Sequence, residues 1–173
     1  MLNQLTGGKP VVLTVLLMAV LFIAGQADAQ TKNAGKMTMT YTKIDSFVVA
    51  DTENHSMILG ESKGTNASAG ENAFMDGAEN IIYSYADLTM GSGLNMGYNT
   101  FTKGDDMVIV KWKGEVKATM TEEGIPNITF SGTFEYIKGA GQYENITGSG
   151  TFKGQFTSDT EYVVDWEGEY TLK

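Results

Sequence analysis

One histidine lies among acidic residues in the N-terminal half of the chain. His55 belongs to the polar segment DTENHS at 51–56, beside Asp51 and Glu53. Imidazole next to carboxylates can act as a general base or bind a metal ion. The interpretation we favour is a surface-loop histidine in a polar turn, because a single histidine with no cysteine makes a poor metal site.

Two carboxylates have strand positions that could turn them inward. Glu61 has the alternation parity of Leu59, and Asp87 has that of Tyr85. A carboxyl group in an apolar cavity has a raised pKa and can act as an acid–base catalyst. Alternatively, the strands are bulged or at an edge, and both acids are solvated. Glu61, Asp87 and His55 are therefore the catalytic candidates, with solvated acids the favoured interpretation.

A second set of candidates is aromatic. These residues carry large apolar rings with a few hydroxyl or indole donors, which suits an apolar ligand. They are Tyr136, Trp112, Trp166, Tyr162 and Tyr170. A filled core explains them equally well, because a barrel of about eight strands either fills with side chains or holds one small ligand.

Composition excludes several functions. The chain has no cysteine and no arginine, and its net charge is −9. Thiol chemistry and zinc–thiolate sites are thereby excluded. A phosphate backbone would be repelled and would find no arginine to grip it, so we expect no nucleic-acid partner. We also expect no metal and no cofactor, and a small apolar ligand is the partner that fits best.

The N-terminus is typical of a secretory signal peptide. Lys9 precedes an apolar run at 11–24, and a small-x-small motif ends at Ala29. The run is shorter than the roughly 20 apolar residues that a membrane anchor needs. We expect 1–29 to be removed, leaving 30–173 as one secreted or periplasmic domain that is not held in a membrane.

The elements that must position these side chains are strands. The clearest is 107–120, where Val108, Val110 and Trp112 share one parity and lysines share the other. No segment of 30–173 has the 3.6-residue apolar period of a helix, whereas the small polar residues of 64–73 indicate an exposed loop. The sequence predicts an all-β domain.

Glycines favour a closed barrel over a two-sheet sandwich. Several of them share the parity of the inward aromatic residues, and glycine relieves crowding where strands cross in a tight barrel. They are Gly114, Gly132, Gly148, Gly150, Gly154 and Gly168. We expect roughly eight antiparallel strands.

One hairpin carries a family resemblance. The segment FEYIKGAGQYENITGSG at 134–150 resembles a hairpin of the allene oxide cyclase and dirigent families, and of uncharacterised secreted bacterial proteins. The resemblance implies an eight-stranded antiparallel calycin-like barrel with a hydrophobic cavity, often assembled as a homo-oligomer. It carries over no catalytic residue. Dirigent-type sites are associated with arginine, which this chain lacks.

Three functional hypotheses remain open from the sequence. The first is binding of a small hydrophobic molecule inside the barrel. The second is a cofactor-free cyclase or isomerase acting there, which needs an inward carboxylate such as Glu61 or Asp87. The third is a solid-cored structural or interaction module, which would have no cavity and an apolar patch on its outer surface.

Overall fold

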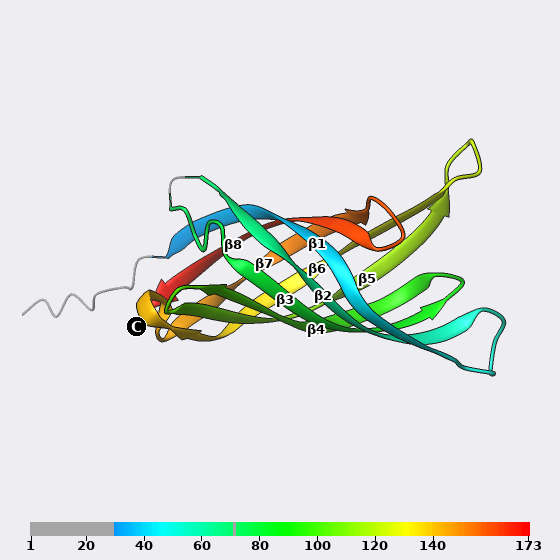
Figure 1. The fold of residues 1–173 in the computed structure, drawn as a ribbon, viewed down its shortest axis with the longest axis horizontal. Coiled ribbons are helices and arrows are strands. Elements are labelled where there is room, and N and C mark those ends of the chain that lie inside the picture. The colour runs from blue at the N-terminus through cyan, green and yellow to red at the C-terminus, as the bar shows by residue number, and fades with distance from the viewer. Residues whose placement is uncertain (1–29, 71) are drawn as a thin grey trace, which may run out of the picture.

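The chain forms one closed β-barrel (Figure 1). The structure is a computed structural model that describes residues 30–70 and 72–173, so the expected signal peptide lies outside the described residues. The strands are β1 (Thr31–Val48), β2 (His55–Ala69), β3 (Glu79–Thr89), β4 (Ser92–Lys103), β5 (Asp106–Met120), β6 (Pro126–Ala140), β7 (Ile146–Phe156) and β8 (Glu161–Leu172). A 3-10 turn, η1 (Gly141–Tyr143), joins β6 to β7. No helix in these two ranges is long and apolar enough to cross a membrane.

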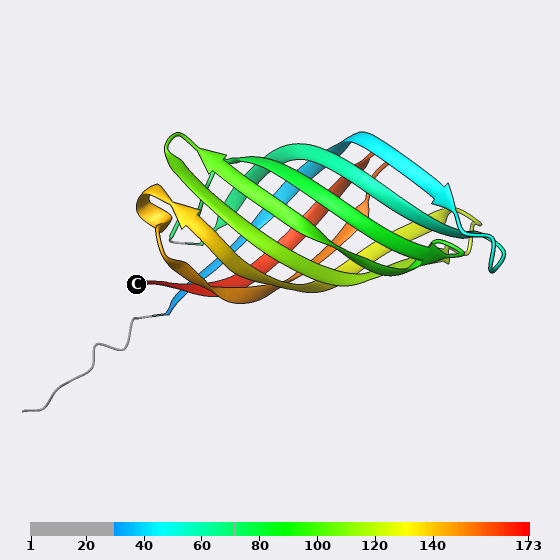
Figure 2. The ribbon, with the colours of Figure 1, turned by 90° about the horizontal axis from the view of Figure 1, so that it is seen from below.

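Closure occurs between the first and last strands. Each strand pairs antiparallel with the next, and β8 pairs with β1 from Thr31–Tyr170 to Thr40–Glu161. Figure 2 shows the strands coiling around one long axis. The predicted all-β, eight-stranded antiparallel barrel is confirmed, and the sandwich alternative is wrong.

Aromatic rings opposite glycines allow the barrel to be narrow. Phe134 lies opposite Gly150, and a Cβ on that glycine would come 2.4 Å from the phenyl ring. Phe152 lies opposite Gly132 in the same way. Three further opposed pairs repeat the arrangement: Trp112–Gly97, Phe130–Gly154 and Trp166–Gly35. Each ring fills the space that a neighbouring side chain would otherwise need, as expected for inward glycines.

The loop between β2 and β3 closes one end of the barrel. Phe74 and Met75 are only 1% and 2% exposed. The Phe74 ring packs at centroid distances of 5.0 to 6.2 Å against five aromatic rings: Phe101, Tyr136, Tyr143, Trp166 and Tyr170. We call Phe74 and Met75 the plug. The expected loop at 64–73 is partly wrong, because β2 continues to Ala69.

A buried asparagine holds the plug in place. Asn66 Nδ2 donates to the carbonyl oxygens of Phe74 and Met75 at 3.1 and 3.0 Å. Its Oδ1 accepts from Trp166 Nε1 at 3.0 Å. The backbone N–H of Met75 donates to the Tyr143 hydroxyl at 3.3 Å. Since buried polar groups are costly when unpaired, this network fixes the plug to the barrel wall.

Candidate functional site

A cavity of about 400 Å³ occupies the barrel on the far side of the plug. It extends from Tyr136 and Trp166, which pack against Phe74, towards the turns at the opposite end. Gly91 in the β3–β4 turn and Asp159 in the β7–β8 turn line it there, and Asp159 is exposed. The cavity is therefore a cup, closed by the plug and reaching the surface at these turns, which we call the mouth.

One wall of the cup is aromatic. It is formed by inward side chains of β6, β7 and β8 and by the phenylalanine that ends β7. These are Phe130, Phe134, Phe152, Phe156 and Tyr162. Phe130 packs edge-to-face against Phe156 and Tyr162, with centroid distances of 6.0 and 5.7 Å. This wall offers ring faces and edges to an apolar molecule.

The wall formed by β4 and β5 carries polar atoms instead. Asn95 and Asn99 lie two residues to either side of Gly97, which pairs with Trp112 on β5. Asn95 Oδ1, Asn99 Oδ1 and Trp112 Nε1 are buried, and none has a hydrogen-bond partner among the described residues. All three side chains line the cavity. We call Asn95, Asn99 and Trp112 the polar strip.

Glu61 and Asp87 do not point into the cup, which corrects the inward orientation considered for them. Ser62 is fully buried, so alternation puts the neighbouring Glu61 on the outer face, where it accepts from Thr42 Oγ1 at 2.8 Å. Ala86 and Leu88 line the cavity, so Asp87 between them points outward.

The outer face of this part of the barrel is unusually apolar, which explains why residue alternation allowed an inward orientation for Glu61 and Asp87. The residues that share the outward parity are large, and their exposed fractions run from 38 to 57%. They are Met57, Leu59, Tyr83, Leu94, Met96 and Tyr98. A rule that assigns the more apolar face of each strand to the interior therefore exchanges the inner and outer faces of β2 and β3.

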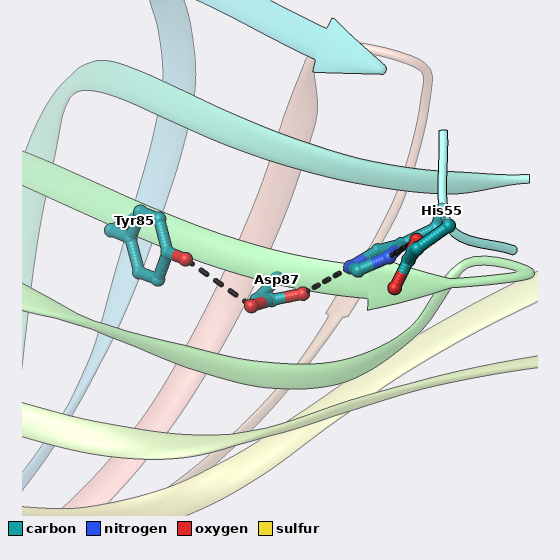
Figure 3. A network of polar contacts seen from close by, with 4 residues as sticks. His55, Tyr85 and Asp87 are labelled. Atoms are coloured by element: carbon teal, nitrogen blue, oxygen red, sulfur yellow. Dashed lines mark hydrogen bonds and ion pairs between the residues drawn. The ribbon is translucent and has the colours of Figure 1, made fainter. Parts of the chain in front are cut away.

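His55 and Asp87 meet on this outer face (Figure 3). His55 Nε2 lies 2.6 Å from Asp87 Oδ1, and His55 Nδ1 lies 2.5 Å from Asp51 Oδ1. Tyr85 donates its hydroxyl to Asp87 Oδ2 at 3.3 Å. Hydrogen bonds to Asp87 and Asp51 raise the pKa of His55, because they stabilise the imidazolium. The cluster joins the β1–β2 turn to β3 and lies outside the cup.

Four of the five aromatic candidates line the cavity: Trp112, Tyr136, Tyr162 and Trp166. Tyr170 does not; its ring lies 5.3 Å from Phe74 at the plugged end. Burial raises the pKa values of Tyr136 and Tyr162, so both hydroxyls stay neutral at physiological pH. The Tyr136 hydroxyl accepts from Asn33 Nδ2 at 2.8 Å. That these side chains contact a ligand stays a prediction.

Sequence reasoning identified Trp112 of the polar strip but missed Asn95, Asn99 and Asp159. The asparagines could have been found, because Asn95 and Asn99 alternate with Met96 and Tyr98 on a strand that is otherwise apolar or small. Asp159 lies in the turn SDT and has no pattern that marks it. Of the described residues that line the cavity, Asp159 is the only one that carries a formal charge.

No cluster of three or more histidine, aspartate or glutamate side chains able to hold a metal ion occurs in 30–70 and 72–173. The sequence matches no protein-family model and no curated protein. Among solved structures, the chain resembles a pterocarpan synthase dirigent protein with a TM-score of 0.46 and 11% identity. The alignment covers 90% of this chain and 96% of that chain. The fold class stated above follows from the strand topology itself.

Proposed function

We propose that this is an exported protein that binds one small hydrophobic molecule inside its barrel. The observation that carries the proposal is the cup of about 400 Å³ with its aromatic wall. Sites for small molecules are concave, largely apolar and typically about 300 to 1,000 Å³, with a few polar groups that fix orientation. Export is supported by the sequence of 1–29 alone, and a secreted or periplasmic location stays a prediction.

A solid-cored module accounts for the apolar outer face of β2 to β4 but not for the cavity. Protein interiors normally pack without voids much larger than a water molecule, because each void loses dispersion contacts along its lining. An empty cavity of this size would cost stability without compensation. A ligand that fills the cup would restore those contacts and remove its own apolar surface from water.

The enzymatic alternative lacks a carboxylate at depth among the described residues that line the cup. The hypothesis drawn from the sequence needs an inward carboxylate such as Glu61 or Asp87, and both lie outside the cup. Asp159 lines the cavity only at its mouth. Binding and carriage therefore account for the geometry better than turnover.

Native mass spectrometry of the purified full-length protein tests the proposal, with the released small molecules identified. We expect a bound apolar compound in the unmodified protein. Ala86→Trp fills the cup from β3 and should abolish binding, whereas Tyr83→Trp places the same side chain on the outer face of β3 and should leave it unchanged. A correctly folded protein that carries no compound, and takes up none from a panel of lipids and terpenoids, would refute the proposal.

A further inference from the structure

Each residue of the polar strip has one buried polar atom with no hydrogen-bond partner among the described residues. Asn99 is 2% exposed, and its Nδ2 donates to Met37 Sδ at 3.2 Å, so its Oδ1 is the free acceptor. Asn95 Oδ1 is a second acceptor and Trp112 Nε1 is a donor. A buried polar atom without a partner costs about 1 to 3 kcal/mol, so three of them on one wall demand an explanation.

Each asparagine is a diagonal cross-strand neighbour of Trp112, so one small group can lie between the indole and one asparagine side chain. Trp112 is directly opposite Gly97, and the two asparagines are each two residues from that glycine. Residues two apart on one face of a strand are separated by roughly 7 Å. A small polar group beside the indole, on the side of either asparagine, would therefore be near the Trp112 N–H and near one asparagine oxygen; the two asparagines themselves are roughly 14 Å apart along the strand.

The donor and acceptor types select the chemistry of that group. A hydroxyl donates one hydrogen bond and accepts others, so it can pair with an asparagine Oδ1 and with Trp112 Nε1 together. A ketone or ether could use only the indole donor. A carboxylate would face two acceptor oxygens, and no lysine lines the cavity among the described residues. A pure hydrocarbon would leave all three atoms unpaired.

The acidic residues at the mouth also favour an uncharged ligand. The turns at this end carry Asp51 and Glu53 between β1 and β2, Glu122 and Glu123 between β5 and β6, and Asp159 between β7 and β8. An anion would meet this acidic rim before reaching the cup, and like charges repel it. An uncharged molecule would enter without that penalty.

We propose that the ligand is an uncharged, largely apolar molecule whose hydroxyl group binds the polar strip, with its apolar body against the aromatic wall. This inference rests on the proposed function and adds the ligand's chemical class. It assigns Asn95, Asn99 and Trp112 as specificity-determining residues. The aromatic residues then contribute binding free energy that does not depend on which polar group the ligand carries.

The test is calorimetric binding of three matched probes to the purified full-length protein: 2-methylnaphthalene, 2-naphthalenemethanol and 2-naphthoate. We expect the alcohol to bind about tenfold more tightly than the hydrocarbon, as one or two hydrogen bonds to buried partners would give. The carboxylate should bind more weakly than both. In Asn99→Leu and Asn95→Leu, the alcohol's advantage should shrink while the hydrocarbon's affinity is retained.

Thr100→Val, which changes an outward residue of the same strand, is the matched control and should keep the full preference. Circular dichroism identifies any variant that fails to fold, and two independent asparagine variants keep the test decisive. Equal affinities for alcohol and hydrocarbon, as a strip permanently satisfied by water would give, overturn the inference but leave the proposed function standing. Tighter binding of the carboxylate would also overturn the inference and leave the proposed function standing. A preference for the alcohol over the hydrocarbon that survives both asparagine substitutions would do the same. If no probe binds to the folded protein, the inference fails, whereas the proposed function fails only if the native mass spectrometry described above also finds no bound compound.

Discussion

Trp112 lies against Gly97 on the neighbouring strand, so closely that a Cβ at position 97 would come 2.7 Å from the indole ring. The absence of a side chain at Gly97 thus leaves the space that the indole ring occupies. The same Cβ would also come 2.1 Å from the carbonyl oxygen of Tyr83. Both contacts are far shorter than atoms tolerate.

Gly97→Ala should therefore destabilise the barrel by about 2 to 3 kcal/mol, the cost of forcing extra volume into a packed site. Chemical denaturation measures the change in the free energy of unfolding. Gly104→Ala is the control, since nothing lies within 4 Å of a Cβ there and only its positive φ of 59° is strained. That strain costs about 1 kcal/mol. Equal losses in the two variants would contradict the steric argument.

Asn66→Ala should lower the free energy of unfolding by about 2 to 4 kcal/mol, because it leaves Trp166 Nε1 and two plug carbonyls unpaired. Hydrogen exchange should also show loss of protection at Met75, whose N–H is held by Tyr143. Asn72→Ala removes an exposed hydrogen bond to the carbonyl of Lys32 and should change stability by less than about 0.5 kcal/mol. Retained protection at Met75 would show that Asn66 does not hold the plug.

Phe74→Ala should cost about 3 to 5 kcal/mol, since it removes the centre of the aromatic cluster at the closed end. Near-ultraviolet circular dichroism should weaken at the same time, because the surrounding rings lose their fixed packing. Phe47→Ala is the matched control, with a side chain 56% exposed, and should be close to neutral. A neutral Phe74→Ala would mean that the plug does not contribute to the core.

The pKa of His55 should lie above its usual 6.5. Since the folded-state pKa is raised, the stability that His55 contributes is complete below pH 6.5 and is lost as the pH rises through the folded-state pKa. The melting-temperature difference between the unmodified protein and His55→Gln should thus be larger at pH 6 than at pH 9. As the chain has one histidine, a single NMR resonance reports the titration directly.

Asp87→Asn should lower the pKa of His55 more than Asp51→Asn does, because the hydrogen bond to Asp87 is the larger cause of the shift. Asp45→Asn, on the same outer face but paired with Lys43 at 3.0 Å, should leave it unchanged. A pKa at or below 6.5 in the unmodified protein would contradict the arrangement of His55 between two carboxylates.

The strand pattern and barrel closure could be predicted because both depend on local alternation. Glycines such as Gly132 and Gly150 share the parity of Phe134 and Phe152, and that shared parity is what the closed barrel requires. The plug could not be predicted in this way. Phe74 is a single aromatic residue in a polar loop, and its burial depends on partners from β4, β6, β8 and η1 that are distant in the sequence.

The candidate site was predicted only in part, and for a physical reason. A rule that places apolar residues inside works for β5 and β8 but fails for β2 and β3, where Leu59 and Tyr83 are outside. It therefore allowed an inward orientation for Glu61 and Asp87, although solvated acids were the favoured interpretation. Asn95 and Asn99 were missed by the same rule, because polar residues on the inner face of a strand are assigned to solvent.

The plug has a kinetic consequence. Because Asn66 holds Phe74 across one end of the barrel, a bound molecule must leave through the mouth by which it entered. Association and dissociation then cross the same barrier at Gly91 and Asp159. Substitutions at these turns should change both rate constants in proportion, so residence time could be altered while the dissociation constant stays the same.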